Sequence, residues 1–307
     1  MLPNPALAAL GFAPEDRVVI MHADDLGMCH AANTAFAALV ESGRPLSGSV
    51  MVPCPWFPEL AALGRAHPEA DIGVHLTLNS EHPLYRWGPV STRDVTSGLL
   101  DPDGYSPSMV EALHSRMSAD AAMTEMRTQI ERAQAAGLDV THVDAHMAAV
   151  VYPSLLRHYV DLALQFRIPL LLPRLTPELM GRLNLEQEYG ENARSHMERL
   201  EAAGCPLIDH ISTPSPQSPR DLLSQYKRAI EALEPGLTHF ILHPAAPGVE
   251  IEAIASDAWT RVADFEMMLG DEIWSHLRAA GIQVLGYRSL RRLMRVALGE
   301  HAEVGDD

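Results

Sequence analysis

The chain has 307 residues, of which 47% are hydrophobic and 21% are charged, so it can bury a large core, and an intrinsically disordered protein is excluded. Its 40 acidic and 23 basic residues give a net charge of −17 at pH 7, which argues against nucleic acid and against an anionic membrane surface as partners. No apolar stretch is long enough to span a bilayer, and the opening segment lacks the positive charges of a signal peptide.

The first part of the chain alternates strand patterns with helix patterns. In chain order, the expected elements are a strand at 18–25, a helix at 30–43, a strand at 45–52, a helix at 57–67 and a strand at 70–79. A segment rich in Pro, Gly, Ser and Asp follows, from about residue 80 to residue 107. It is long for a simple connection, and we expect it to form a lid or a binding loop.

The alternation continues toward the C-terminus. The next expected elements are a helix at 120–137, a strand at 139–150, a helix that begins at Pro153, strands at 168–174 and 205–212, a helix opened by Ser218 and Pro219, and strands at 237–246 and 281–290. The last residues, GEHAEVGDD, form an acidic tail that we expect to be frayed.

Eight strand patterns that alternate with helices indicate a parallel sheet covered by helices. No Gly-rich phosphate loop follows the first strand, so the signature of a Rossmann or P-loop protein is missing. We therefore predict an α/β fold, a (β/α) barrel of the TIM type, built as one domain over residues 1–307 with a loop insertion around 80–107.

The three cysteines form no pattern. Cys29, Cys54 and Cys205 are odd in number and widely spaced, which argues against a disulfide framework and against a zinc-thiolate site. Together with the missing signal peptide, they predict a soluble cytoplasmic protein. The sequence leaves open whether it forms a homo-oligomer.

Residues capable of metal binding or proton transfer lie on four of the predicted strands. They are Asp24 and Asp25 on the first strand, His75 on the third, His142, Asp144 and His146 on the fourth, and His243 on the seventh. Because the carboxyl ends of parallel barrel strands meet at one rim, we expect these side chains to lie close together. Two histidines and one carboxylate, with open positions left over, are the ligand set of many catalytic metal sites.

These residues leave several roles and functions open. A dication between the strands would hold one of Asp24 and Asp25 ionised and leave the other to act as a base. Asp144 would orient a neighbouring ligand, and His243 would protonate a leaving group. One of the two aspartates is alternatively a helix N-cap. Paired carboxylates also serve metal-independent glycoside hydrolysis, and a barrel that only binds a sugar is a third alternative.

Four short motifs carry these residues: ADDLG on the first strand, GVHLTL on the third, THVDAH on the fourth and HP on the seventh. They resemble the motifs of the YdjC-like family of carbohydrate deacetylases (the ChbG/HpnK type), which is related in design to the NodB-type polysaccharide deacetylases. The resemblance extends from about residue 17 to the seventh strand. It implies a distorted (β/α) barrel and a hydrolase that uses one divalent ion, zinc or magnesium, to remove the acetyl group from an N-acetylated sugar.

The same resemblance implies a role for each matching residue. The implied roles are Asp25, His75 and His146 as metal ligands, Asp24 as the base, His243 as the acid and Arg174 as a substrate contact. One segment departs from the family, because HMAAV places Met147 and Ala148 where further histidines are common. We therefore expect the metal site to follow the family and the substrate side of the pocket to differ.

Overall fold

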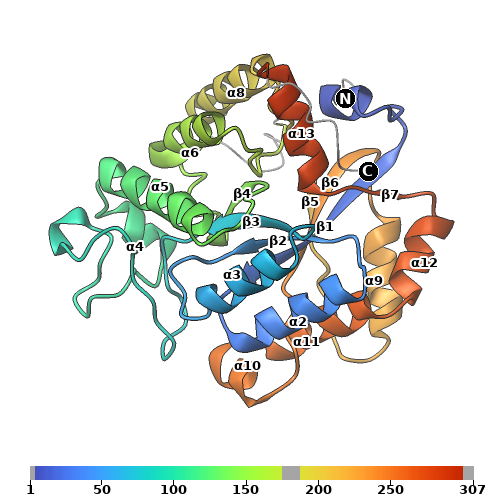
Figure 1. Ribbon diagram of the computed structural model, residues 1–307, viewed down its shortest axis with the longest axis horizontal. Coiled ribbons are helices and arrows are strands. Elements are labelled where there is room, and N and C mark those ends of the chain that lie inside the picture. Colours follow the sequence, from blue (N-terminus) through green and yellow to red (C-terminus); the bar gives the residue numbers. More distant parts are fainter. Residues whose placement is uncertain (1–3, 175–186, 300–307) are drawn as a thin grey trace.

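Seven parallel strands form the central sheet (Figure 1). The computed structural model describes residues 4–174 and 187–299, so the predicted acidic tail from residue 300 onward lies outside the described residues. The strands are β1 (Arg17–Leu26), β2 (Ser47–Val50), β3 (Asp71–Leu76), β4 (Val143–Ala145), β5 (His210–Ser212), β6 (Gly236–Leu242) and β7 (Gln283–Val284). Their order is β4-β3-β2-β1-β6-β5, and β7 pairs with the first part of β1.

The segment 168–174 connects the two edges of this sheet. Leu170 pairs with Val143 of β4, and Pro173 pairs with Ile208 just ahead of β5, both in the parallel sense. Pairing therefore continues around the whole ring, which confirms the distorted α/β barrel that the sequence predicts. The strand expected here is reduced to two single pairs, because the two prolines of the segment lack the N–H that a ladder needs.

Three other predicted strands are much shorter than expected. Only Val143–Ala145 of 139–150 form β4, only the last three residues of 205–212 form β5, and only two residues of 281–290 form β7. A 3-10 helix at His146–Ala148 ends the first of these segments, and helix α13 (Tyr287–Ala297) begins inside the third. Tyr287, Leu290 and Met294 recur at helical spacing and are all buried, so the helical pattern prevails over the strand pattern.

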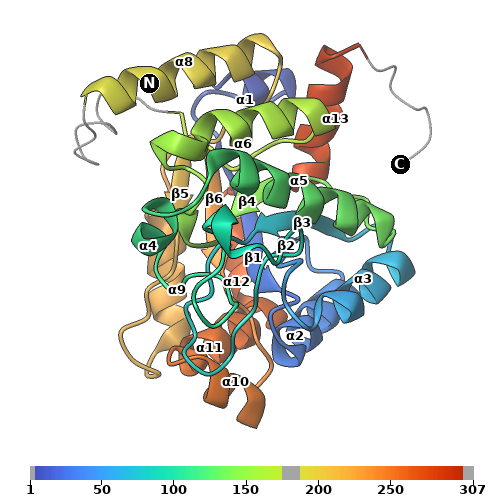
Figure 2. The same cartoon turned by 90° about the vertical axis from the view of Figure 1, so that its left-hand side faces the viewer.

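Helices cover the outside of the barrel (Figures 1 and 2). Besides α13 they are α1 (Pro5–Ala9), α2 (His30–Glu41), α3 (Phe57–Ala66), α4 (Val110–His114), α5 (Ala119–Ala135), α6 (Pro153–Phe166), α8 (Gln187–Ala202), α9 (Leu222–Glu231), α10 (Val249–Ile254), α11 (Ala258–Leu269) and α12 (Glu272–Ala279). The four helices predicted first along the chain are present as α2, α3, α5 and α6. Among residues 4–174 and 187–299, no helix combines the length and the apolar character needed to cross a membrane.

The predicted start of α9 is wrong. The helix begins at Leu222, after Asp221 at its N-cap, and not at Pro219. The Ser218 hydroxyl accepts the backbone N–H of Arg220 at 3.3 Å, which forms a turn ahead of the helix. The Ser218 side chain, which we expect to cap the helix, therefore bonds to a turn that precedes the N-cap of α9.

The long segment predicted at about 80–107 contains only the short 3-10 helix η1 (Val95–Ser97). Its backbone is nevertheless held in place. Glu125 of α5 is buried and accepts the backbone N–H groups of Val90 and Ser91 at 2.9 and 2.7 Å. The indole of Trp87 donates to the carbonyl of Asn79 at 2.8 Å. The segment is thus packed against the rim of the barrel by hydrogen bonds.

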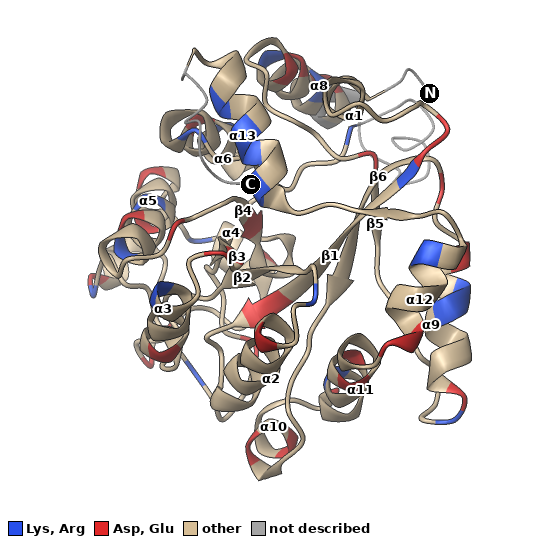
Figure 3. Ribbon diagram, turned by 45° about the vertical axis from the view of Figure 1, so that its right-hand side comes forward, with Lys and Arg blue, Asp and Glu red and all other residues tan. Residues whose placement is uncertain are grey.

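Strand β1 separates an apolar layer from a polar one. Val19, Met21 and Ala23 pack in the main apolar core between the sheet and the helices. Each large apolar side chain buried there stabilises the fold by about 1.5–3 kcal/mol. The alternate residues His22 and Asp24 face other buried polar side chains inside the barrel. Many charged residues lie on the helices, and β1 itself ends in a buried acidic pair (Figure 3).

Candidate active site and metal centre

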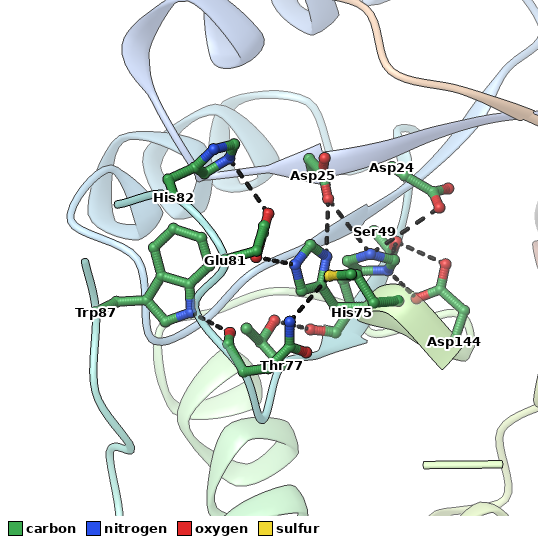
Figure 4. Close-up of polar contacts among 12 residues, drawn as sticks. Asp24, Asp25, Ser49, His75, Thr77, Glu81, His82, Trp87 and Asp144 are labelled. Carbon is green, nitrogen blue, oxygen red and sulfur yellow. Dashed lines mark hydrogen bonds and ion pairs between the residues drawn. The ribbon is translucent and has the colours of Figure 1, made fainter. Parts of the chain in front are cut away.

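Three of the predicted ligands converge at the carboxyl ends of the strands. Asp25 lies in β1, His75 in β3, and His146 begins the 3-10 helix η2 (His146–Ala148) directly after β4. Their ligand atoms lie within 4.8 Å of one another, and all three residues are buried. The Oδ1 atom of Asp25 is 3.4 Å from His75 Nε2 (Figure 4). It is 3.2 Å from His146 Nδ1.

The Asp25 carboxylate offers one oxygen to this cluster. Its Oδ2 atom accepts a hydrogen bond from the buried guanidinium of Arg261 at 2.8 Å. Its Oδ1 atom is buried and has no hydrogen-bond partner. A buried carboxylate oxygen without a partner is costly unless a cation or a proton donor approaches it. This oxygen and the two facing imidazoles fit a divalent metal ion.

The electrostatics of the cluster agree with this fit. Burial raises the pKa of Asp25, but Arg261 and the two imidazoles outweigh it and hold the pKa well below the ordinary value. Burial lowers the pKa of His75, but the Asp144 carboxylate outweighs it and the pKa is raised well above the ordinary value. The pKa of His146 is raised to about 9 in the same way, by Asp25 and Glu81 against burial. Positive charge is therefore stabilised at this position.

A second carboxylate orients each imidazole. His75 Nδ1 lies 2.9 Å from Asp144 Oδ1 (Figure 4). His146 Nε2 lies 2.9 Å from Glu81 Oε2. These bonds leave His75 Nε2 and His146 Nδ1 directed at Asp25. Carboxylates that bond the outer nitrogen of a metal-binding histidine fix its tautomer and its ring orientation. Asp144 thus lies where the sequence predicts an orienting residue, and its other oxygen accepts the Ser49 hydroxyl at 2.8 Å.

Asp24 lies beside this cluster and has a different partner. Its Oδ1 atom is 2.7 Å from His22 Nδ1, and its Oδ2 atom is 3.9 Å from His75 Nε2. Asp24 shares a second group of buried ligand-type residues with His22, Asp144 and His239. The two neighbouring aspartates therefore enter two different sets of contacts.

His243 follows β6 at the same rim. Leu242 pairs with Ala23, so the next residues on the two strands, His243 and Asp24, follow side by side. The backbone N–H of His243 donates to Asp264 Oδ2 at 2.7 Å. Asp264 lies on α11, three residues after Arg261, so one face of α11 supports both ends of the site.

Arg174 contacts carboxylates that lie outside this cluster. Its guanidinium pairs with Glu201 and Asp209 at 3.1 and 3.2 Å. Asp209 also accepts the backbone N–H of Leu237, at the opposite end of β6 from His243. The contact between Arg174 and a substrate stays a prediction.

Sequence reasoning missed three side chains that contact the site. Glu81 lies in the long loop, Arg261 lies on a helix that we did not expect, and His22 lies on β1. A signal for His22 was present, since the two-residue period of a strand places it on the same face as Asp24. No local pattern marks Glu81 or Arg261.

The fold and the site define an α/β barrel protein with a candidate divalent-metal centre at the carboxyl ends of its strands. The chain belongs to the YdjC-like protein family, whose model matches residues 18–279. This membership confirms the resemblance found in the four sequence motifs.

Curated relatives support this assignment, and one solved structure shares the fold. The chain is 33% identical over 278 residues to a carbohydrate deacetylase of Thermus thermophilus, covering 91% of this chain and 95% of the relative. It is 25% identical over 278 residues to a carbohydrate deacetylase of Geobacillus stearothermophilus, covering 90% of this chain and 99% of the relative. The crystal structure of a protein from Enterococcus faecalis V583 shares the fold, with a TM-score of 0.70 and 20% identity over 90% of this chain and 99% of that chain.

Proposed function

We propose that this protein hydrolyses the acetamide of an N-acetylated amino sugar or oligosaccharide, with one divalent ion held by Asp25, His75 and His146. The observation that carries the proposal is the buried Oδ1 of Asp25, which accepts no hydrogen bond and faces two imidazoles that carboxylates orient. The relatives named carbohydrate deacetylases support the choice of substrate class. The donor set of two nitrogens and one oxygen favours zinc over magnesium, which prefers oxygen ligands.

The bound ion would supply Lewis-acid polarisation of the acetyl carbonyl and a lowered pKa for water. Asp24 takes the proton from the attacking water through its Oδ2 atom, because its Oδ1 atom is occupied by His22. His243, which follows the neighbouring strand, gives a proton to the departing nitrogen. An amine leaves an amide only when it is protonated, so base and acid must both reach the reacting group.

The proposal includes two expectations about the surroundings of the enzyme. The partner is a sugar, and neither nucleic acid nor a membrane is required, in keeping with the net charge of −17. A cytoplasmic location is also proposed. Cys29, Cys54 and Cys205 are all free and buried, which supports a reducing compartment.

The test measures free acetate released from N-acetylglucosamine oligomers. Wild-type protein stripped with EDTA is expected to be inactive and to recover when zinc is added. Asp24→Asn is expected to release acetate about 100- to 10,000-fold more slowly while it still binds zinc, because only the base is lost. The exposed Asp120, in the first turn of α5, provides the matched control Asp120→Asn, which should retain wild-type activity.

Three results would contradict the proposal or a part of it. If zinc-loaded wild type releases no acetate, the proposed activity is wrong. If turnover is insensitive to EDTA and yields new reducing ends instead of acetate, metal-independent glycoside hydrolysis is correct. Full activity of Asp24→Asn would show that another group is the base.

A further inference from the structure

A chain of hydrogen bonds leads from the barrel interior to Asp24. Thr141 Oγ1 lies 2.9 Å from His142 Nδ1, and His142 Nε2 lies 2.7 Å from His22 Nε2. The other ring nitrogen of His22 lies 2.7 Å from Asp24 Oδ1. Thr141, His142 and His22 are each 0% exposed, so water does not compete for these bonds.

The His142 ring is held on its faces. The ring of Tyr287 stacks on it, with centroids 3.8 Å apart and planes 13° from parallel. Gly73 of β3 also lies against the ring, and a Cβ at that position would come within 2.6 Å of three ring atoms. The imidazole therefore cannot tilt away from His22 without disturbing β3 or α13.

The donors of this chain can be assigned by counting protons. Burial holds the pKa of His142 well below its ordinary value, so its ring is neutral and carries one N–H. The bond between the two Nε2 atoms has room for one proton. When His142 provides it, His142 Nδ1 is free to accept the Thr141 hydroxyl, and His22 needs a single proton on Nδ1. In the opposite direction the Thr141 hydroxyl would accept from His142 Nδ1, and its own buried O–H would then have no acceptor among the described residues.

We propose that Thr141, His142 and His22 form a hydrogen-bond relay whose donors all run toward Asp24, so that His22 positions the carboxylate with Oδ1 occupied and Oδ2 free. The inference rests on the proposed function, in which Asp24 is the base. Oδ2 is the oxygen that faces His75 Nε2, at 3.9 Å, on the side of the ligand set. His22 and His142 are positioning residues, since neither contacts the reacting atoms.

The first test uses two substitutions of His22, each of which places a side-chain amide nitrogen near the position of one ring nitrogen. The side-chain nitrogen of asparagine replaces Nδ1, and that of glutamine replaces Nε2. His22→Asn retains a donor to Asp24, whereas His22→Gln faces His142 and leaves Asp24 Oδ1 without its donor. We expect His22→Gln to lower kcat roughly 100-fold at unchanged KM, as a misplaced group does, and His22→Asn to recover most of that loss. Zinc affinity, measured by calorimetry, should stay at the wild-type value in both.

A further variant covers the case in which glutamine does not fold. His142→Phe keeps the stacking on Tyr287 and removes both ring nitrogens, and it is expected to lower kcat at unchanged KM and unchanged zinc affinity. Equal kcat values for His22→Asn and His22→Gln, or a wild-type kcat for His142→Phe, would overturn the positioning role.

The second test needs no activity. In metal-free protein labelled with ¹⁵N-histidine, ring-nitrogen chemical shifts should show His22 protonated at Nδ1 only and His142 at Nε2 only. The spectra of His22→Asn and His142→Phe assign the two signals. A doubly protonated His22, or His142 protonated at Nδ1, would overturn the direction of the relay. Because this measurement is independent of acetate release, failure of the relay and failure of the proposed function are distinguishable.

Discussion

Asp25 has a left-handed backbone conformation with a φ of 60°, which is rare for a residue with a side chain. In a regular strand, Asp24 and Asp25 would point to opposite faces. The left-handed backbone conformation of Asp25 instead brings both carboxylates toward His75. A non-glycine residue held in this region costs about 1–3 kcal/mol, and the contacts of Asp25 with Arg261 and the two histidines maintain it.

The first prediction concerns Arg261. Arg261→Met leaves the buried Asp25 carboxylate without its guanidinium, and we expect the free energy of unfolding of metal-free protein to fall by about 3 kcal/mol. Zinc should restore part of this loss, because it supplies positive charge to the same carboxylate. Urea unfolding with EDTA and with zinc measures both effects. The surface pair of Arg199 and Asp161 provides the control, and Arg199→Met should change stability by less than about 1 kcal/mol. Equal losses in the two variants would contradict the prediction.

The second prediction concerns Glu81. Glu81→Ala removes the carboxylate that orients His146, and zinc affinity should fall about 10- to 100-fold, as is typical when such a partner is lost. Isothermal titration calorimetry gives the dissociation constant. The chain contains a matched exposed pair, His67 and Glu69, whose ring nitrogen and carboxylate lie 3.1 Å apart. Glu69→Ala should bind zinc like the wild type, and an unchanged affinity of Glu81→Ala would refute the orienting role.

At the scale of the element, α13 packs against the barrel at the amino ends of β3 and β4. Arg288 and Arg291 of this helix both bind the carboxylate of Asp139, which lies in the connection between α5 and β4. Arg291 also donates to the carbonyl of Val140 at 2.8 Å. Among the described residues, the last helix is thus tied to the segment that runs through His142 into β4, which carries Asp144.

The third prediction follows from this tie. Hydrogen bonds from Arg291 and Arg288, opposed by burial, lower the pKa of Asp139 from 3.8 to about 2. A carboxylate with a lowered pKa stabilises the folded state when the pH is above 3.8, its pKa in the unfolded chain. This contribution to stability is lost as the pH falls to about 2. Asp139→Asn should therefore reduce stability at pH 7 by about 1 kcal/mol, since the carboxylate is half exposed and solvent screens it. In urea titrations, the difference from wild type should persist to about pH 4 and vanish near pH 2. A difference that stays constant down to pH 2 would contradict this explanation.

At the scale of the whole molecule, the proposed metal centre joins distant parts of the barrel. Its three proposed ligands come from β1, from β3 and from the turn after β4. None of these segments holds the set alone, so the site exists only in the folded chain. Binding to the folded state alone stabilises it by mass action.

The fourth prediction is a thermal shift. At a zinc concentration about 100 times the dissociation constant, the folded state should gain about 2.7 kcal/mol, and the midpoint of thermal unfolding should rise accordingly. His75→Asn, which removes one ligand, should lose most of the shift. His114 of α4, which contacts Ser154 and the carbonyl of Ala149, provides the control His114→Asn with an undiminished shift. A shift that His75→Asn retains would exclude this centre as the zinc site.

Much of the fold could be predicted because it is encoded in local patterns. The apolar residues of α2, α5 and α6 recur at helical spacing, and most of them are buried in the structure, with Val40 and Met123 half-buried. The strand at 168–174 and the start of α9 were predicted less well. Proline in a potential ladder and a serine that closes a turn act through hydrogen bonds that composition does not reveal.

The sequence by itself determined which residues reach the rim: polar side chains at the ends of four parallel strands must meet there, and Asp25, His75 and His146 do so. Only the tertiary structure decided what surrounds them. Arg261 is 236 residues from Asp25 in the chain, and Glu81 reaches His146 from an irregular loop. Periodicity reports which face of an element is buried, since burial acts on each element locally. The partner that neutralises a buried charge is set by how distant elements pack, and no local pattern contains that information.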